Sequence, residues 1–368
     1  MRTDNDVVIV LGGGLAGLTA AVELHRSART VQVVEARPFV GGRTMTLRPA
    51  DLADGVWFDV GATWHWEDQP RVRALASELG LSVFPQYRDG LVVVDLAPGA
   101  EPERHQLPPP SPAELRFAGG AQTLCERLAA QLPEGSVLLD TVAVSVEQDG
   151  DGAGVRVSVT DPDGESRDLA AAAVIVAMPP RLALQDLAFT PDLPDALVGA
   201  MQRTPTWMAT ALKCVAVYES AFWRDAGLSG AAVTENGPLR EVHDGSTASG
   251  HAAALWAFVS PRHEFRDLPF DDRIEQVFAH LGRLFGPAAA DPLRYFERDW
   301  SGDPYTNDET FVAGGDLLPY GHPVFERPLM GGRLVWAGTE TSSAGGGHME
   351  GAVVSGQRAA RQVLDATR

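Results

Sequence analysis

The chain has 368 residues, 45% of them hydrophobic and 21% charged, a composition typical of a globular protein of about two domains. Its formal net charge of −19 would repel the phosphates of a nucleic acid, and no clean apolar run of about 18 residues offers a membrane-spanning helix. The acidic start lacks the basic segment of a secretory signal, and two distant cysteines, Cys125 and Cys214, suggest neither a disulfide framework nor a metal cluster. We therefore expect a cytoplasmic protein without a metal site that binds neither nucleic acid nor membranes.

The first predicted elements form a nucleotide-binding turn. A strand at 6–11 runs into GGGLAG, and a helical segment follows at 18–27. Gly12, Gly14 and Gly17 satisfy the pattern G-x-G-x-x-G. Gly12 permits a tight turn, Gly14 lets a pyrophosphate approach the helix N-terminus, and Gly17 lets the helix pack closely on the strand. This arrangement predicts a bound dinucleotide.

The second predicted strand, at 30–35, ends on an acidic residue, Glu35. A carboxylate at this position can accept hydrogen bonds from both hydroxyls of an adenosine ribose, and it would repel a 2′-phosphate. The order of strand, turn, helix, strand and acid makes a chance glycine-rich turn a poor explanation.

The middle of the chain reads as loop and strands. A Pro-rich stretch at 96–112 is expected to be an exposed loop. Strands are predicted at 141–148, on both sides of an Asp-Pro-Asp-Gly turn within 154–169, and at 172–180. This order predicts a meander followed by a buried strand.

The sequence contains a single lysine, Lys213, among 30 basic residues. It lies in a predicted strand whose alternation places Val215 on its own face and Cys214 on the other. An ammonium on an apolar face is poorly solvated and loses its proton easily, which a guanidinium does not. Lys213 is either a survivor of a drift towards arginine or a functional residue.

Four separated segments resemble one protein family. They are EARPFVGGRT at 35–44, DVGATWHW at 59–66, RDWSGDPYTNDETF at 298–311, and the glycine-rich stretch with its following helix at 332–364. Together they resemble the flavin-containing amine oxidases, and most closely the branch of the monoamine oxidases and putrescine oxidases. The likeness covers nearly the whole chain.

The resemblance implies an α/β fold with an FAD-binding, Rossmann-type domain like that of glutathione reductase and a second, mixed-sheet substrate domain. We expect the FAD-binding domain to be discontinuous, comprising 1–68, 121–202 and 303–368. The substrate domain is then expected to comprise 69–120 and 203–302.

The resemblance and the glycine motif together imply a set of cofactor-binding residues. These are Gly12, Gly14, Leu15, Ala16, Gly17, Glu35, Ala36, Arg37, Gly42, Arg43, Gly61, Ala62, Thr63, Trp64, Val142, Met178, Trp300, Gly338, Thr339, Glu340, His348, Met349 and Ala352. In the family, the helix that begins near Met349 would direct its N-terminus at the isoalloxazine and stabilise negative charge on the reduced ring.

Four residues are implied in catalysis. The family lysine, which holds a water against flavin N5, corresponds to Lys213, and the tryptophan that packs near the isoalloxazine corresponds to Trp300. The two tyrosines that hold the amine in monoamine oxidases correspond to Thr310 and His348, so the tyrosine cage is absent. Monoamine oxidases attach FAD through a cysteine after this tryptophan, but the run at 307–310 has none, which predicts noncovalent FAD.

Three residues keep alternative interpretations. Val142 either contacts the adenine or is a core strand residue. His65 either lies near the flavin or packs in an aromatic cluster. Glu350 is expected to have a structural or flavin-adjacent role and not to act as a general base. The chain is also short where larger members carry a helical subdomain over the substrate, which suggests an open site.

The implied reaction is FAD-dependent oxidation of a primary or secondary amine to an imine, with O2 reoxidising the flavin to give hydrogen peroxide. Two alternatives stay open. An L-amino-acid oxidase would need a cation for the substrate carboxylate, and an amine dehydrogenase would pass electrons to a protein acceptor. The expected partners are a small amine and O2, and the protein is expected to be a monomer or a homodimer.

Overall fold

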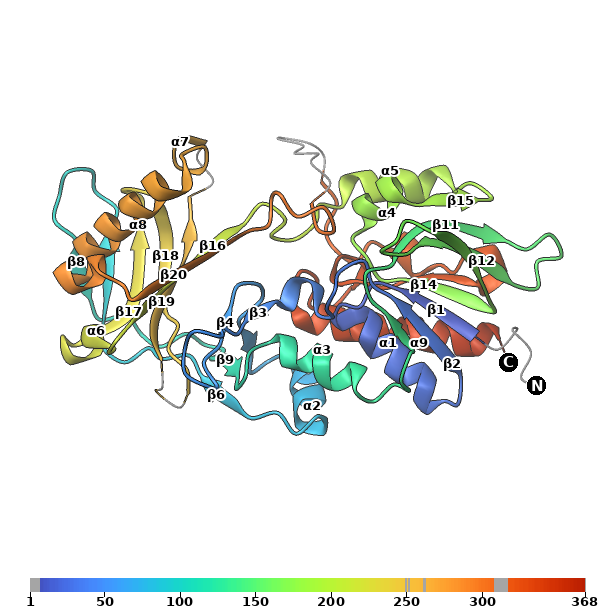
Figure 1. The fold of residues 1–368 in the computed structure, drawn as a ribbon, viewed down its shortest axis with the longest axis horizontal. Helices are drawn as coiled ribbons and strands as arrows, with labels where there is room; N and C mark the ends of the chain where they lie inside the picture. The colour runs from blue at the N-terminus through green and yellow to red at the C-terminus, as the bar shows by residue number, and fades with distance from the viewer. Residues whose placement is uncertain (1–6, 249, 251, 261–262, 308–316, 368) are drawn as a thin grey trace.

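The computed structural model describes residues 7–248, 250, 252–260, 263–307 and 317–367. Two parts built on sheets lie at opposite ends of its long axis (Figure 1). Segments that connect and flank them lie between the two parts in Figure 1, including the strands β3 (Thr46–Leu47), β4 (Phe58–Asp59) and β9 (Glu114–Phe117).

A five-stranded parallel sheet forms the centre of one part. Its short runs of valine, isoleucine and leucine are buried on both faces, as parallel sheets require. In sheet order its strands are β10 (Val137–Leu138), β2 (Thr30–Val34), β1 (Val7–Leu11), β14 (Ala173–Val176) and β21 (Leu334–Trp336). Because β1 and β2 run in parallel, the residues that follow them, including Gly12 and Glu35, lie at the same edge of the sheet.

Helices cover one face of this sheet and form the first core with it. They are α1 (Leu15–Arg26), α2 (Pro70–Glu78), α3 (Gln122–Ala129) and α9 (Met349–Ala366). Helix α9 lies directly on α1, and a Cβ at Gly356 would be 2.4 Å from the carbonyl oxygen of Ala16. The absence of a side chain there lets the two helices approach closely.

A four-stranded sheet and two helices cover the other face. The sheet order is β13 (Ser166–Ala171), β12 (Val155–Thr160), β11 (Val142–Gln148) and β15 (Ala188–Thr190), and the helices are α4 (Pro180–Asp186) and α5 (Asp195–Arg203). Strands β12 and β13 pair in antiparallel fashion on either side of the Asp-Pro-Asp-Gly turn, as predicted. Their inward side chains form a second core with Trp336 and Phe325.

A seven-stranded sheet forms the other part. In sheet order its strands are β20 (Arg294–Asp299), β16 (Leu212–Tyr218), β19 (Ala253–Val259), β18 (Leu239–Asp244), β17 (Leu228–Thr234), β7 (Leu91–Asp95) and β8 (Glu103–His105). The helices of this part are α6 (Phe222–Asp225), α7 (His263–Arg266) and α8 (Phe270–Phe285). Along β16 the predicted alternation is confirmed, because Cys214 packs in the core with α8 whereas Val215 packs in the core with Phe58.

Shorter elements complete the described chain. Two small sheets contain β3 (Thr46–Leu47) with β4 (Phe58–Asp59), and β5 (His65–Trp66) with β9 (Glu114–Phe117) and β6 (Val83–Pro85). Short 3-10 helices cover Gly42–Thr44, Pro287–Ala290, Pro323–Glu326, Met330–Gly332 and Thr339–Thr341.

The expectation of a plain loop at 96–112 was wrong in one respect. The segment is largely exposed, but Glu103–His105 forms the edge strand β8 by pairing with β7. Prolines flank this strand on both sides, and an exposed edge strand tolerates prolines that an inner strand would not.

The strands of the five-stranded and four-stranded sheets fall within the ranges predicted for the FAD-binding domain, and those of the seven-stranded sheet within the ranges predicted for the substrate domain. Helix α2 departs from this division, because Val72 and Leu75 pack in the first core although they belong to the range 69–120. The exact domain boundaries remain a prediction.

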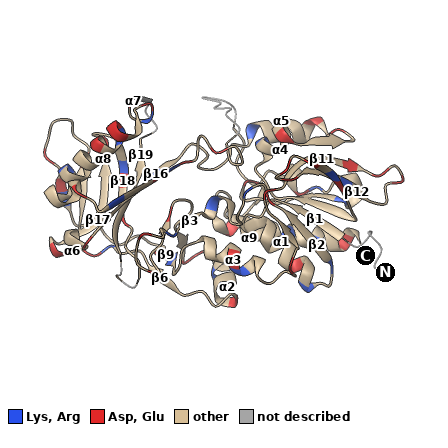
Figure 2. Ribbon diagram, in the orientation of Figure 1, with Lys and Arg blue, Asp and Glu red and all other residues tan. Residues whose placement is uncertain are grey.

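Charged side chains lie mainly on helices and loops, and the inner strands β1 and β14 carry none (Figure 2). Within the part of the chain that the structure describes, we find no helix with both the length and the apolar character needed to cross a membrane.

Candidate active site

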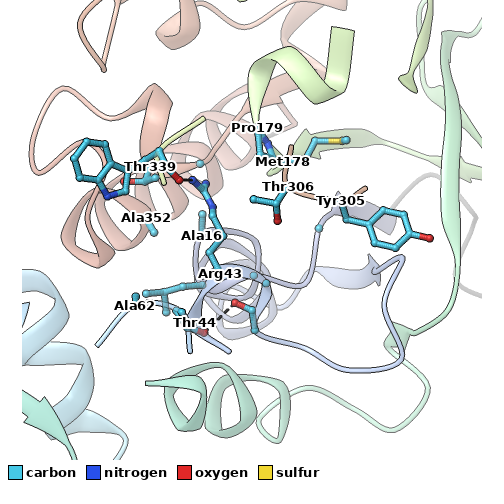
Figure 3. Close-up of a pocket in the computed structure, with 18 of the residues that line it drawn as sticks. Ala16, Arg43, Thr44, Ala62, Met178, Pro179, Tyr305, Thr306, Thr339 and Ala352 are labelled. Atoms are coloured by element: carbon cyan, nitrogen blue, oxygen red, sulfur yellow. Dashed lines mark hydrogen bonds between the residues drawn. The ribbon is translucent and has the colours of Figure 1, made fainter. Parts of the chain in front are cut away.

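A cavity of about 470 Å³ lies between the two parts. Figure 3 shows side chains from the starts of α1 and α9 and from the loop after β14 converging on it, among them Ala16, Ala352 and Met178. Lys213 and Trp256, from the seven-stranded sheet, line its other end. The cavity therefore joins the carboxyl edge of the parallel sheet to the face of the second sheet that carries the lysine.

Nearly all of the predicted cofactor and catalytic residues line this cavity. Gly17 and Glu340 are the exceptions among the described residues, since neither contributes to its wall. Thr310 lies outside the described residues. Val142, which had two interpretations, lies on the cavity wall and is only half-buried.

The three motif glycines have the geometry that their spacing predicts. Gly12 has a φ of +109°, and a Cβ there would lie 2.7 Å from the carbonyl oxygen of Ala177. A Cβ at Gly17 would lie 2.0 Å from the carbonyl oxygen of Gly12, so Gly17 serves the packing of α1 on β1 and not the ligand. Gly14 lines the cavity and meets nothing closer than 3.9 Å, which leaves its backbone open to a ligand.

Glu35 is held in place by backbone donors. Its two carboxylate oxygens accept hydrogen bonds from the N–H groups of Gly13 at 2.7 Å and Arg37 at 2.9 Å. Burial raises the pKa of Glu35, and these two donors and the Arg37 charge oppose the shift. Each oxygen keeps a further lone pair, so the carboxylate can still accept hydrogen bonds from a diol in the cavity.

Asp303 connects two segments that are far apart in the sequence. It accepts hydrogen bonds from the guanidinium groups of Arg37 and Arg298 and from the backbone N–H of Tyr305 at 3.0 Å. Arg37 also donates to the hydroxyl of Thr306 at 3.0 Å. Asp303 therefore fixes the segment after Trp300 against the segment after β2. Sequence reasoning missed it because nothing local to Asp303 indicates a distant arginine.

Arg43 and Glu340 form a bidentate ion pair, with N–O distances of 2.5 and 3.0 Å. Burial alone would raise the pKa of Glu340, but Arg43 holds it below its ordinary range. The pair also fixes the backbone of Trp207, whose carbonyl accepts from Arg43 and whose N–H donates to Glu340, both at 3.2 Å. Glu340 therefore acts on the cavity through Arg43 and Trp207, and its predicted contact with the cofactor stays a prediction.

Aromatic rings stand around the residue predicted to replace one tyrosine of the cage. The ring of His348 lies 5.0 Å from that of Trp66 and 6.1 Å from that of Trp207. Trp207 and its neighbour Met208 are 43% and 40% exposed although both line the cavity, which places the mouth of the cavity beside them. Burial lowers the pKa of His348, with a small opposing effect of Asp68, so its imidazole is neutral at pH 7.

Lys213 is fully buried at the cavity wall. Its ammonium donates to the carbonyl oxygen of Gly61 at 3.2 Å and to the hydroxyl of Thr63, and it lies 3.9 Å from the centre of the Trp256 ring. Burial lowers the pKa of Lys213 to about 7, although the carboxylate of Asp59 acts in the opposite direction. The predicted loss of solvation is therefore present, and this amine can exchange a proton near neutral pH.

Trp300 belongs to the cavity wall, and its place beside an isoalloxazine stays a prediction. Its ring lines the cavity, its indole N–H donates to the carbonyl oxygen of Val60 at 2.9 Å, and the guanidinium of Arg298 lies 4.9 Å from its centre. These contacts fix the plane of a ring that faces the same space as Lys213.

Two further candidates have structural roles. Both carboxylate oxygens of Glu350 accept backbone N–H groups at the start of α2, from Arg71 at 3.0 Å and Val72 at 2.8 Å. His65 is fully buried and stacks on Phe117 at 4.3 Å, and neither of its nitrogens has a hydrogen-bond partner. The structural interpretation of Glu350 and the packed-cluster interpretation of His65 are therefore the ones that the geometry supports.

The residues fit an FAD molecule. Glu35 offers a ribose acceptor at one end, and α1 begins at the cavity with Gly14 as its N-cap and no acidic residue in its first turn. Helix α9 also begins at the cavity, and the acid in its first turn, Glu350, is bound to α2. Two positive helix ends thus face a space suited to phosphates and to a reduced ring. Neither Cys125 nor Cys214 lines the cavity, so no thiol is available there for attachment.

Residues 15–116 and 110–364 match the model of a protein family described as flavin containing amine oxidoreductase. The chain belongs to this family. The match confirms the resemblance inferred from four sequence segments, and with it the class of enzyme, an amine oxidoreductase whose cofactor is FAD.

Individual members of this family align with nearly the whole chain. A probable flavin-containing monoamine oxidase A of Dictyostelium discoideum is 25% identical, covering 99% of this chain and 98% of its own length. A putrescine oxidase of Kocuria rosea is 27% identical and covers 98% and 95%. The first alignment extends over 466 positions, more than the 368 residues of this chain, so that relative has segments this chain lacks.

Solved structures confirm the predicted fold class. A putrescine oxidase bound to putrescine superposes with a TM-score of 0.83 at 24% identity, covering 98% of this chain and 99% of its own. The cyclohexylamine oxidase of Brevibacterium oxydans gives a TM-score of 0.83 at 22% identity over the same shares of the two chains.

Proposed function

We propose that this flavin-containing amine oxidoreductase oxidises a monoamine with an aromatic or cyclic apolar body, and that O2 reoxidises its noncovalently bound FAD to give hydrogen peroxide. The observation that carries this proposal is the composition of the cavity end around Lys213. Its lining is dominated by the rings of Trp64, Trp66, Trp207, Trp256, Phe258 and Trp300. The amine of Lys213 and the imidazole of His348 line the same end.

The cofactor and the residues at this end of the cavity have separate roles in the proposed reaction. FAD, when bound, supplies the acceptor for the hydride equivalent that leaves the carbon beside the amine nitrogen. Neutral His348 can accept a hydrogen bond from the amine, and the faces of Trp66 and Trp207 can contact its apolar body. Lys213 can hold or release a proton beside the reacting atoms, because burial brings its pKa to about 7.

One observation disfavours an amino acid as the substrate, and a second disfavours a diamine. A substrate carboxylate needs a cation, but the guanidinium groups of Arg37 and Arg43 are bound to Asp303 and Glu340. The buried Lys213 amine already donates to Gly61 and Thr63. A diamine would need a carboxylate for its second ammonium, and no carboxylate lines the aromatic end within the described part of the chain. A monoamine satisfies the site without either group.

A peroxide-coupled screen tests the substrate class. We expect arylalkyl and cycloalkyl monoamines to give a higher kcat/KM than putrescine or any L-amino acid at pH 8. The same amines measured with an artificial electron acceptor under argon provide the control for O2. Preference for putrescine or an amino acid would overturn the substrate proposal, and slow return of the oxidised flavin spectrum in air would identify a dehydrogenase.

Two substitutions test the role of Lys213. Lys213→Met should retain FAD but reduce its flavin about 100-fold more slowly, the scale of a lost acid–base group. Lys213→Arg should not restore the rate, since it keeps the charge but neither the shape nor the proton exchange of an amine. Wild-type rates in both variants would remove Lys213 from the reaction.

Acid precipitation tests the attachment of the cofactor. We expect all of the yellow colour to appear in the supernatant, because neither cysteine reaches the cavity. Flavin that stays in the protein pellet would show a covalent bond.

A further inference from the structure

The closest aromatic neighbour of the lysine charge is Trp256. On the seven-stranded sheet, β19 pairs with β16 so that Trp256 stands opposite Val215 and Phe258 stands opposite Lys213. The Lys213 nitrogen lies 3.9 Å from the centre of the Trp256 ring, well inside the range of a cation–π contact. Both side chains are buried and both line the cavity.

The hydrogen bonds of Lys213 do not include a carboxylate. They go to the carbonyl oxygen of Gly61 and the hydroxyl of Thr63. Three other groups act on its charge from the elements packed around it. Asp59 on β4 favours the ammonium, Arg116 on β9 opposes it, and Cys214 on the same strand favours it slightly. One oxygen of Asp59 is bound to Thr46 and to the N–H of Ala121. The ring of Trp256 is thus a direct electrostatic contact of a charge without a bound counter-ion.

Other side chains hold this ring firmly. Trp64, His243 and Phe258 lie 4.9, 4.5 and 5.3 Å from it between ring centres. His243 is fixed in turn by Arg88 at 3.1 Å and Glu241 at 3.4 Å. A Cβ at Gly245 would lie 3.1 Å from Cδ1 of Trp256, so the backbone leaves room for the indole. The ring position is determined by its surroundings and not by the lysine.

We propose that Trp256 is a positioning residue for Lys213. The face of the Trp256 ring holds the Lys213 ammonium at the cavity wall and favours its charged form. This proposal rests on the proposed function only in taking Lys213 to be part of the reaction. Trp256 acts on that reaction through Lys213.

The single lysine makes the proposal directly measurable. When the FAD-loaded protein is grown with 13C- and 15N-labelled lysine, its NMR spectrum contains one side-chain amine, that of Lys213. The midpoint of its shift against pH gives the pKa of Lys213 without any turnover. Trp256→Leu removes an attraction to the charged form, so the midpoint should fall by about one pH unit. Trp256→Phe keeps a weaker ring face and should fall by less.

Trp66→Leu provides the matched control, because it removes a ring from the same cavity whose aromatic contact is with His348 and not with Trp256 or the ammonium. Its midpoint should stay at the wild-type value. A midpoint that is unchanged or raised in both Trp256 variants would overturn the proposal, and an equal change in Trp66→Leu would assign the effect to hydration of the cavity and also overturn it.

A kinetic measurement separates this proposal from the proposed function. The pH profile of flavin reduction in Trp256→Phe should move by the same amount as its NMR midpoint, and the movement should disappear in the Lys213→Met background. A moved midpoint with an unmoved kinetic profile would keep Trp256 as the positioning residue and refute the role of Lys213 in the reaction.

Discussion

The two ends of the cavity are built in different ways. At the dinucleotide end, backbone groups and ion pairs dominate: Gly12 and Gly14 leave the main chain open, and Asp303 joins Arg37 to Arg298. At the amine end, rings dominate, and the buried charge of Lys213 has neutral oxygens and an aromatic face as its direct contacts. A ligand with its own charges needs fixed counter-groups, whereas a small amine needs an apolar surface and an exchangeable proton. Damage at the first end should therefore appear in cofactor binding and stability, and damage at the second end in pH dependence.

The largest effect is expected from Gly17→Ala at the dinucleotide end. The new Cβ would lie 2.0 Å from the carbonyl oxygen of Gly12, so α1 must move away from β1. We expect loss of measurable FAD binding and a fall of at least about 3 kcal/mol in the free energy of unfolding, by urea denaturation. Gly199→Ala in α5 is the control, because a Cβ there meets nothing within 4 Å. Normal FAD binding by Gly17→Ala would show that this turn is not the dinucleotide site.

The second effect concerns the ion-pair cluster. Asp303→Asn leaves the buried guanidinium of Arg37 without its carboxylate, which should lower the free energy of unfolding by about 3 kcal/mol. FAD should bind about tenfold more weakly in a fluorescence titration, since Arg37 and Glu35 both belong to the segment that follows β2. Asp51→Asn breaks the exposed pair with Arg294 and should change neither quantity. If the two variants behave alike, Asp303 does not hold the dinucleotide end together.

The third effect is a pH dependence of the free energy of unfolding that arises from His65, behind the aromatic end of the cavity. Burial lowers the pKa of His65 to about 4 in the folded state, against 6.5 when exposed. The unfolded chain therefore binds a proton more tightly, so stability present above pH 6.5 is lost as the pH falls towards 4. His65→Phe should gain about 2 kcal/mol over the wild type between pH 8 and pH 5, in urea titrations at each pH. A constant difference between the two proteins would mean that His65 has the same pKa in the folded and the unfolded chain.

The smallest effect is expected from His348→Phe at the amine end. Burial lowers the pKa of His348, so the imidazole is neutral at pH 7 and becomes charged only in acid. A charged imidazole would repel a cationic amine, and the wild-type rate of flavin reduction should carry a falling acid limb that the variant lacks. FAD affinity should be similar in the two proteins. Superimposed pH profiles, measured by stopped flow, would leave His348 as a packing residue.

The same contrast explains how much the sequence could predict. Gly12, Gly14, Gly17 and Glu35 fall within one short stretch, because a single unit of strand, turn and helix binds the dinucleotide, and their geometry agrees with the prediction. Local alternation along 212–218 correctly separated the two faces of β16. The isolation of Lys213 among arginines left open whether it is a survivor of a drift in composition or a functional residue.

Residues that depend on tertiary contacts were not predicted. Trp207 and Trp256 come from a loop and a strand whose local sequence gives no sign of a shared cavity, and they reach it only when two sheets face each other. Trp64 was among the predicted residues and Trp66 was not, although alternate residues around His65 point to the same side and the sequence therefore offered a signal for Trp66. Glu340 was assigned to the cofactor because it follows Gly338 and Thr339, but its side chain turns to Arg43.

Because Lys213 is the only lysine and is buried, it determines how lysine-specific proteases and amine-directed reagents can act on the protein. Within this chain, a protease that cleaves after lysine has one target bond, between Lys213 and Cys214. That bond lies inside β16, which is hydrogen-bonded to β19 on one side and to β20 on the other. Cleavage requires the seven-stranded sheet to open, so the appearance of two fragments would report the opening of this sheet alone. Reagents directed at amines have no exposed lysine to modify, whereas those directed at carboxylates have 49 acidic side chains in the sequence.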